Sequence, residues 1–290
     1  MTTLIAGCGD LGLNIAQRLV HDKVQVIGLK RHPPTSQPFS HLFSWLAADL
    51  KAPTSLRVLQ DLADSIDQVV YCVTPDQRNP EQYRATYLTG LQNLSQILGN
   101  EADPLLNKTV KRRWVFVSST AVYGESLGAI VNENTPTLPA NFNGQVLLEA
   151  EQFLLTHHPH SIVLRLSGIY GPGRNQIVQR ILAGAATAPI DPPYWTNRIH
   201  IDDAARAVVH VLGLKQPLST YIVTDQHALP MHTLYNHIAH LLGVGPVPVG
   251  LPPAGMQSKR LSCERLLESG FKHQWPDARI GYAQMLSDES

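Results

Sequence analysis

The sequence lacks an excess of charge of either sign, and this absence narrows the range of its partners. Its 290 residues carry 23 Lys and Arg against 23 Asp and Glu, so the formal net charge is zero. Proteins that bind nucleic acid or anionic membranes draw much of their affinity from basic clusters that neutralise phosphates. This chain has no run of Lys and Arg longer than the three residues 111–113. We therefore expect a small-molecule partner, with no nucleic acid and no membrane surface.

Long apolar runs, paired cysteines and metal-ligand spacings are also missing. No apolar run approaches the roughly 20 residues of a membrane span, and the N-terminus has no basic segment followed by an apolar one. The three cysteines, Cys8, Cys72 and Cys263, lie far apart without a CxxC motif, which fits a reducing compartment. The thirteen histidines show no HExxH spacing, so no metal site is predicted. These absences predict a cytoplasmic protein.

What the sequence does contain is an alternation of short apolar runs and helix-length segments. Hydrophobic residues make up 43% of the chain, which excludes a disordered protein. The runs are separated by segments such as 81–99, 143–156 and 202–214. This alternation is typical of an α/β fold, with a doubly wound (Rossmann) parallel sheet of about seven strands. The expected strands are 2–6, 24–29, 43–48, 68–73, 114–118, 162–166 and 221–224.

A glycine-rich turn follows the first expected strand. Residues 7–12 read Gly-Cys-Gly-Asp-Leu-Gly, which is the GxGxxG spacing, and they open an amphipathic helical pattern. In dinucleotide-binding proteins the first glycine allows the tight turn, the second lets the backbone approach a pyrophosphate, and the third lets helix and strand pack closely. The helix N-terminus then offers N–H groups to the phosphates. The alternative is a tight turn without a ligand. The expected cofactor contacts here are Gly7, Cys8, Gly9, Asp10, Leu11 and Gly12.

The end of the second expected strand indicates which cofactor is bound. NAD-binding proteins usually carry Asp or Glu about 20 residues beyond the glycines, where it accepts hydrogen bonds from the ribose hydroxyls. Here that place holds Lys30, Arg31 and His32, and no acidic residue occurs between Asp22 and Asp49. Cations at this place would pair with a 2′-phosphate, so Lys30 and Arg31 predict NADP rather than NAD. A basic loop exposed to solvent is the alternative.

The composition of the sequence changes after residue 170, where Gly-Pro-Gly opens a stretch rich in prolines and expected loops. Such a change is typical of a boundary between two parts of a chain. We expect residues 1–169, with 201–224 returning to them, to form the cofactor-binding Rossmann domain. Residues 170–200 and 225–290 are then expected to form a smaller substrate-binding lobe.

Several further motifs occur in a fixed order along the chain. With the glycine-rich turn, they make nearly the whole sequence resemble the extended branch of the short-chain dehydrogenase/reductase superfamily. Within that branch it is most similar to the atypical, YeeZ-like members described as NAD-dependent epimerase/dehydratase proteins. The motifs specify the superfamily much more closely than they specify a reaction. They are Asp49-Leu50, Ser118-Ser119-Thr120-Ala121-Val122-Tyr123-Gly124, Arg165-Leu166, Ile169-Tyr170-Gly171-Pro172-Gly173-Arg174 and Arg198-Ile199-His200-Ile201-Asp202-Asp203.

The resemblance implies roles for individual positions. It implies that Asp49 bonds the adenine amine, that the backbone of 72–75 lines the cofactor, and that Ser119 is the catalytic serine. It also implies that the segment after residue 166 flanks the nicotinamide, and that the motif around His200 ties the smaller lobe to the cofactor domain. A role for Asp49 in capping the next turn is the alternative. The other cofactor contacts expected from these motifs are Leu50, Val73, Thr74 and Ser118.

One part of the superfamily pattern is absent. Its enzymes use Tyr and Lys four residues apart on one helix face, and the Lys lowers the phenol pKa from about 10 so that Tyr passes a proton at neutral pH. This chain has no Lys between Lys111 and Lys215 and no Tyr between Tyr123 and Tyr170. The family's Asn position falls at Tyr87, so only Ser119 remains of the four. Candidate replacements for the acid are Tyr87, Tyr123, Tyr170 and His200.

These observations leave two functional hypotheses. In the first, the chain is an NADP-dependent oxidoreductase or epimerase with a non-standard active site, acting on a small hydroxyl- or carbonyl-bearing, sugar-like molecule. In the second, it is a non-catalytic NADP-binding module that senses redox state or regulates a partner protein. The resemblance also suggests a homodimer through the helices at 81–99 and 143–156. Residues expected in the substrate lobe are Arg174, Trp195, Arg198 and His200, and the arginines suggest an anionic group.

Overall fold

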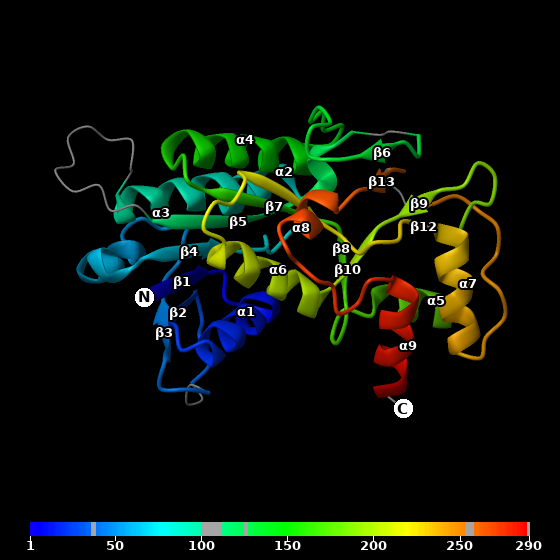
Figure 1. The fold of residues 1–290 in the computed structure, drawn as a ribbon, viewed down its shortest axis with the longest axis horizontal. Coiled ribbons are helices and arrows are strands. Elements are labelled where there is room, and N and C mark those ends of the chain that lie inside the picture. Colours follow the sequence, from blue (N-terminus) through cyan, green and yellow to red (C-terminus); the bar gives the residue numbers. More distant parts are fainter. Residues whose placement is uncertain (36–38, 100–111, 125–126, 253–257, 289–290) are drawn as a thin grey trace. The chain divides into compact units, whose positions relative to one another are not determined.

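The computed structural model describes residues 1–35, 39–99, 112–124, 127–252 and 258–288 (Figure 1). The chain divides into two compact units. Unit 1 comprises Met1–Val122, Asn141–Arg165 and Ala205–Tyr221, and unit 2 comprises Tyr123–Ala140, Leu166–Ala204 and Ile222–Ser290. Within the described ranges, no helix is long and apolar enough to cross a membrane. That one part of the chain binds the cofactor and the other binds the substrate stays a prediction.

The largest element is a sheet of seven strands in the order β11-β7-β5-β4-β1-β2-β3. The adjacent pairs from β3 to β5 run parallel, and Ile5 of β1 is paired with both Gly28 of β2 and Val70 of β4. Strands buried on both faces read as continuous apolar runs, as most of the expected runs do, whereas the edge strand Phe43–Ala47 is only partly buried. The sheet confirms the predicted α/β, Rossmann-like fold. Its strands are β1 (Thr2–Ala6), β2 (Gln25–Lys30), β3 (Phe43–Ala47), β4 (Gln68–Tyr71), β5 (Arg113–Ser119), β7 (Ile162–Leu166) and β11 (Thr220–Val223).

The helices expected from the sequence are also present. The segment expected at 81–99 is one helical run with a π-helical middle, and Asn79 begins it by accepting the Gln82 N–H at 2.8 Å. Helix α1 starts at the glycine-rich turn and buries one face, with Ile15 and Leu19 among its buried residues. The helical segments are α1 (Asp10–His21), η1 (Ser55–Ser65), α2 (Pro80–Tyr83), η2 (Arg84–Thr89), α3 (Gly90–Leu98), η3 (Thr120–Val122), α4 (Phe142–His157) and α6 (Ile201–Gly213).

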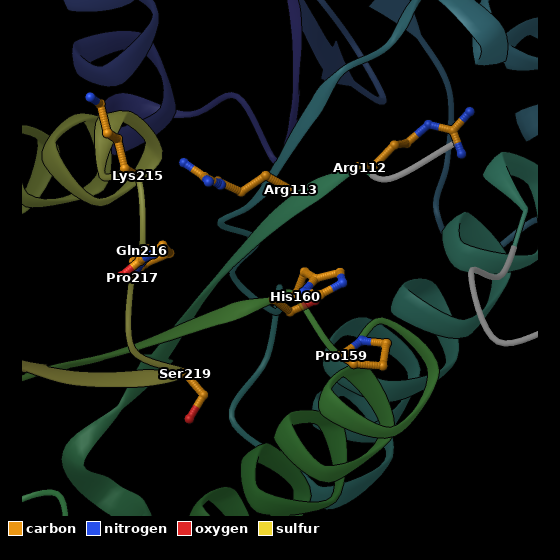
Figure 2. Close-up of a pocket in the computed structure, with 9 residues that line it drawn as sticks. Arg112, Arg113, Pro159, His160, Lys215, Gln216, Pro217 and Ser219 are labelled. Atoms are coloured by element: carbon orange, nitrogen blue, oxygen red, sulfur yellow. The ribbon is translucent and has the colours of Figure 1, made fainter. Parts of the chain in front are cut away.

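A pocket of about 470 Å³ lies at the sheet edge where the strands begin (Figure 2). Arg113 is the first residue of β5, Ser161 precedes β7 and Ser219 precedes β11. Nη1 of Arg113 donates to the carbonyls of Leu212 and Leu214, both at 2.7 Å. Carbonyls at a helix C-terminus lack helical donors, so Arg113 satisfies the end of α6. The pocket is therefore framed by the connections that lead into three neighbouring strands.

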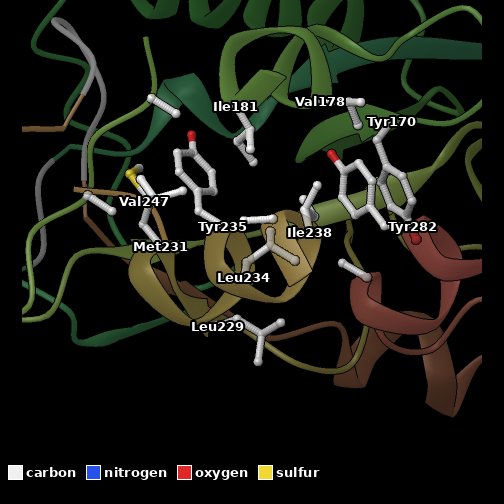
Figure 3. Packing of buried hydrophobic residues seen from close by; sticks show 14 of the residues in the cluster. Tyr170, Val178, Ile181, Leu229, Met231, Leu234, Tyr235, Ile238, Val247 and Tyr282 are labelled. Carbon is white, nitrogen blue, oxygen red and sulfur yellow. The ribbon is translucent and has the colours of Figure 1, made fainter. Parts of the chain in front are cut away.

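Unit 2 has an apolar core of its own (Figure 3). The rings of Tyr170 and Tyr282 stack with centroids 4.4 Å apart, and Met231 and Tyr235 belong to the same cluster. Among its described residues, the strands are short and occur as three pairs. Strands this short leave no periodic pattern of apolar residues from which the sequence could predict them. The pairs are β6 (Ile130–Val131) with β13 (Arg260–Leu261), β8 (Gly168–Tyr170) with β10 (Arg198–His200), and β9 (Trp195–Thr196) with β12 (Leu229–Pro230). The helices are α5 (Gln176–Leu182), α7 (Met231–Leu241), α8 (Glu264–Glu268) and α9 (Ala278–Asp288).

A buried ion pair joins β5, α4 and β7. Nη2 of Arg165 donates to Oε2 of Glu151 at 2.7 Å, and the Ser118 hydroxyl donates to Oε1 at 2.5 Å. The side chains of Arg165 and Glu151 are only 9% and 2% exposed. Removing one partner of such a pair leaves the other charge buried and uncompensated. The pair therefore makes the docking of α4 on the sheet depend on both side chains.

Replacing Glu151 with Ala is expected to lower the free energy of unfolding by about 3–5 kcal/mol, because the Arg165 guanidinium stays buried without its carboxylate. Glu149→Ala is the matched control on the same helix. Glu149 pairs with Arg84 at 2.8 Å, but these side chains are 44% and 52% exposed, and such pairs contribute about 0–1 kcal/mol. Urea unfolding followed by circular dichroism measures both variants. Equal unfolding midpoints for the two would contradict this account.

Candidate functional site

Four of the expected segments meet at the sheet edge where the strands end. Gly7 follows β1, Lys30 ends β2, Val73 follows β4 and Ser119 ends β5. Parallel neighbours in one sheet bring their carboxyl ends together, and ligands of such folds bind outside those ends. The Gly7 N–H donates to the Leu29 carbonyl at 3.2 Å. The glycine-rich turn is thus fixed to the end of β2.

The three glycines of the turn are required for different reasons. Gly7 has a φ of +88°, which favours glycine, and an added Cβ would lie 2.7 Å from Val73 Cα. At Gly12 an added Cβ would lie 3.0 Å from the Gly7 carbonyl oxygen, so helix and strand pack closely there. Gly9 is extended, with φ −88° and ψ −151°, and an added Cβ would meet nothing within 4 Å. Neither backbone nor packing requires glycine at position 9, and its missing side chain leaves space beside the turn.

The first turn of α1 contributes hydrogen-bond donors beside this space. The first helical acceptor is the Gly9 carbonyl, which accepts the Leu13 N–H at 2.8 Å. The helical amides before Leu13 have no main-chain acceptor within the helix, and such an N-terminus binds phosphate well. The Asp10 side chain accepts the Leu11 N–H at 2.8 Å. A phosphate at this place would have to take that N–H from the Asp10 carboxylate.

Cys8 and Cys72 are packed thiols in the same region. Burial raises the pKa of Cys8 to about 12, and it raises the pKa of Cys72 as well. Because the thiolate is the reactive form, neither side chain is suited to nucleophilic chemistry. Val73 and Thr74 follow them and are progressively more exposed. Among the described residues, no group of three His, Cys, Asp or Glu side chains could hold a metal ion.

Arg31, the expected contact for a 2′-phosphate, is held by a carboxylate that sequence reasoning missed. Its Nη1 and Nη2 donate to the two oxygens of Asp76 at 2.9 and 2.5 Å, and Lys51 Nζ lies 3.5 Å from Asp76. The hydrogen bond from Arg31 is the main reason why the pKa of Asp76 lies below its ordinary value. The sequence did contain one signal for this contact, because Asp76 lies shortly after β4 and hence at this edge of the sheet. Arg binds carboxylates and phosphates with the same two-pronged geometry, so Asp76 occupies the guanidinium face that a phosphate would use.

Asp49 caps a turn in the structure, as the alternative for this residue supposed. Its Oδ1 accepts the Lys51 N–H at 2.9 Å, and its own N–H donates to Ser55 Oγ at 2.8 Å. The neighbouring Leu50 is buried, and its carbonyl accepts a hydrogen bond from Asn93 Nδ2 at 2.9 Å. Hydrogen bonds and packing within the local fold therefore explain why Asp49 and Leu50 occur at these positions. Their contacts with a cofactor stay predictions.

The two serines that end β5 have different partners. The buried Ser118 hydroxyl donates to Glu151, which leaves its backbone for any contact with a cofactor. Ser119 is half-buried, and its Oγ accepts the Ala121 N–H at 3.2 Å. A hydroxyl that accepts one hydrogen bond can still donate its own proton to another acceptor. Of the two serines, Ser119 is the one whose hydroxyl proton is not used in this arrangement, and its catalytic role stays a prediction.

Tyr87 and Tyr170 lack surroundings that would make them acidic. Tyr87 lies on the π-helical segment, with its ring 5.4 Å from that of Tyr83 and 6.4 Å from that of Phe116. Burial raises its pKa, and the Tyr83 phenol raises it further. Tyr170 is 1% exposed within the core of unit 2, and burial and nearby carboxylates raise its pKa too. Catalytic roles for Tyr87 and Tyr170 stay predictions, and their electrostatic surroundings do not favour them.

The residues expected in the substrate lobe lie in unit 2. His200 is buried, its Nδ1 accepts the Asp202 N–H at 3.2 Å, and its ring contacts Tyr170 edge-on at 5.2 Å. Trp195 is half-buried, with the Arg260 guanidinium 5.0 Å from its ring centroid. His200 therefore acts as part of the packing, whereas Trp195 offers a partly open aromatic surface.

Arg198 and Arg174 differ in how the fold accommodates them. Arg198 lies against Gly168 of the paired strand, where an added Cβ would be 2.5 Å from its Nη1, so the glycine makes room for the guanidinium. Its Nε is buried and makes no hydrogen bond to any described residue. Arg174 closes a tight turn by donating its N–H to the Gly171 carbonyl at 2.9 Å. The fold thus provides a surrounding shaped for the Arg198 side chain.

Asp225 is a buried carboxyl that interacts with Arg198. It is 2% exposed, and its Oδ2 accepts the Ala278 N–H at 3.0 Å. Its Oδ1 is buried without a hydrogen bond to the described residues. Burial raises the pKa of Asp225 well above its ordinary value, and the hydrogen bond from the Ala278 N–H, with a smaller effect of the Arg198 charge, opposes this only in part. The folded protein therefore favours the protonated form of this carboxyl.

Asp225→Asn is expected to flatten the pH dependence of stability. An unfolded Asp loses its proton near pH 4, whereas folded Asp225 keeps it to higher pH. The contribution of this group to the free energy of unfolding should therefore fall as pH rises from about 4 upward, by at most about 1.4 kcal/mol per pH unit. Asn keeps the acceptor for Ala278 and cannot ionise. Urea unfolding across this range measures the difference. The exposed Asp61→Asn serves as control, and parallel pH profiles for wild type and Asp225→Asn would contradict the account.

Comparison with known proteins shows the family of the chain. Residues 3–222 match the model of the NAD dependent epimerase/dehydratase family, and the chain belongs to that family. Protein YeeZ of Escherichia coli K12 is 30% identical over 280 residues, which cover 95% of this chain and 97% of that protein. A solved structure from Methylobacillus flagellatus, assigned to the NAD-dependent epimerases/dehydratases, is 36% identical with a TM-score of 0.79. That match covers 99% of this chain and 98% of the other.

More distant structures show the same fold. The UDP-glucose 4-epimerase of Thermotoga maritima, solved with UDP-glucose, is 18% identical with a TM-score of 0.79, over 99% of this chain and 98% of that one. WbmG of Bordetella bronchiseptica, solved with NAD, is 18% identical with a TM-score of 0.78, over 99% and 93%. At these identities the likeness concerns the fold.

Proposed function

We propose that this protein is an oxidoreductase or epimerase that binds NADP and acts on a small hydroxyl- or carbonyl-bearing, sugar-like molecule. The observation that carries the proposal is Gly9, where a glycine that neither the backbone nor the packing needs leaves space at the N-terminus of α1. A pyrophosphate is the ligand for which this kind of turn leaves room. NAD bound to the structural relative WbmG supports a dinucleotide as the occupant.

The chain's own groups fit the parts of such a cofactor. Backbone N–H groups at the start of α1 would bond the pyrophosphate, and the main chain of Val73 and Thr74 would line the cofactor beyond β4. Arg31 and Lys30 would hold a 2′-phosphate. When bound, the nicotinamide accepts or supplies a hydride at its C4 atom. The Ser119 hydroxyl would donate a hydrogen bond to the oxygen of the reacting substrate carbon.

The preference for NADP rests on the charges at the end of β2. Arg31 already binds one oxyanion, the Asp76 carboxylate, with both terminal nitrogens. A 2′-phosphate would compete with Asp76 for the same face of the guanidinium. If the protein preferred NAD instead, Asp76 itself would accept hydrogen bonds from the ribose hydroxyls of NAD. The two preferences predict opposite effects of neutralising Asp76.

Asp76→Asn is expected to tighten NADPH binding about tenfold, because it frees Arg31 for the 2′-phosphate and removes a repulsive charge. Arg31→Ala is expected to weaken NADPH binding by about 10- to 100-fold, as loss of a charge-assisted pair would. NADH binding should change little in either variant. Calorimetric titration of each variant with both cofactors measures these effects. Weaker NADH binding by Asp76→Asn, with NADPH unaffected, would establish the NAD preference instead.

The proposed active site lacks the Tyr and Lys pair of the superfamily. A positioned acid–base group contributes about 10²- to 10⁴-fold in rate, whereas holding reactants together can supply about 7–11 kcal/mol. Loss of the pair therefore slows carbonyl chemistry without abolishing hydride transfer. This comparison supports an enzyme with a slow or unusual proton-transfer step.

Ser119→Ala is expected to lower kcat by about 10²- to 10³-fold, the usual loss when one donor to a developing oxyanion is removed. NADPH affinity should be unchanged, since the backbone after β5 is kept. NADPH oxidation over a panel of aldehydes, ketones and nucleotide sugars measures turnover. If the wild type turns over none of them, the non-catalytic redox-sensing module becomes the better hypothesis.

A homodimer through the helices at 81–99 and 143–156 also stays a prediction, which the molar mass in solution tests.

A further inference from the structure

The pocket at the amino-terminal edge of the sheet has a lining of one charge sign (Figure 2). Arg112, Arg113 and Lys215 bring three permanent cations to it, and His160 adds an imidazole. None of the described residues that line it is acidic. A cluster of like charges is unfavourable unless counter-ions or a ligand offset it. The chemistry of the lining therefore fits an anion.

The two arginines contribute mainly charge. Figure 2 shows them extending to opposite sides of β5. Arg112 donates from Nε to the Ile66 carbonyl at 3.0 Å and from Nη2 to the Ala63 carbonyl at 2.7 Å, and it also bonds the Leu98 carbonyl. Arg113 uses Nη1 to bond the carbonyls of Leu212 and Leu214 at the C-terminal end of α6. Backbone carbonyls are neutral, so the bonds of Arg113 fix its guanidinium group without cancelling its charge.

A second observation points to a ligand. Ser161 also lines the pocket, is 2% exposed, and its Oγ makes no hydrogen bond to any described residue. A buried hydroxyl without a partner is costly. Lys215 and His160 stand nearby on the exposed rim. A buried donor below a cationic rim is an arrangement that would surround an oxyanion.

We propose that this pocket binds the phosphate group of a small molecule, at a site separate from the cofactor. A volume of about 470 Å³ falls within the range of small-ligand pockets and exceeds the need of a free phosphate. The glycine-rich turn lies where strands end, whereas this pocket lies where β5, β7 and β11 begin. The two sites therefore occupy opposite edges of one sheet, and both can be filled at once.

Calorimetric titrations with inorganic phosphate and with ribose 5-phosphate, at fixed ionic strength, test the proposal. Lys215→Glu is expected to weaken binding of both by at least about tenfold, and Ser161→Ala to weaken it several-fold. Lys272→Glu, the same charge change at an exposed lysine in unit 2, should have no effect. Tighter binding of the ester than of inorganic phosphate would identify an organic phosphate as the ligand.

Gly9→Val separates this pocket from the cofactor site, because it fills the space beside the glycine-rich turn. The proposal expects Gly9→Val to keep phosphate binding and to lose NADPH binding. It is overturned if the wild type binds neither phosphate, if Lys215→Glu binds as the wild type does, or if Gly9→Val loses phosphate binding. Loss of NADPH binding without loss of phosphate binding leaves the proposed function and this inference independently supported.

Discussion

The contact between the turn after β1 and the main chain after β4 is the constraint on which the candidate site depends. Gly7 can approach Val73 so closely only because it has no side chain and adopts a positive φ. That approach sets the direction in which the chain enters α1. Gly12 then lets the helix pack on the turn. With both ends fixed, Gly9 is left facing open space, and the helix N-terminus points its amides at that space.

The charges around this edge are arranged for binding more clearly than for proton transfer. Arg31, Lys51 and Asp76 form an exposed network at the ends of β2 and β4. By contrast, the phenols of Tyr87 and Tyr170 have pKa values raised by burial. Ser119 offers a hydroxyl but has no base among its hydrogen-bond partners. The structure thus shows an open space beside the glycine-rich turn, whereas the phenols of Tyr87 and Tyr170 are buried.

The sheet could be predicted from the sequence because buried parallel strands leave continuous apolar runs, and glycine spacing marked the turn. Asp76 was missed because a carboxylate on a loop carries no local pattern, and its partner Arg31 lies 45 residues away. Tyr170 was a candidate acid because it sits in a motif, yet its ring belongs to the core of unit 2. Burial of a motif residue depends on distant segments such as α9, which motif spacing does not encode.

The most direct test of the account is NADPH binding by Gly9→Val compared with the wild type, with thermal unfolding measured on both. The extended backbone at Gly9 accepts Val, and nothing lies within 4 Å of an added Cβ. The account predicts the same melting temperature and a loss of NADPH affinity of at least about 100-fold, since the side chain would occupy the place of the pyrophosphate. Equal NADPH affinity in a folded Gly9→Val protein would contradict it, because the space beside the turn would then not be the cofactor site.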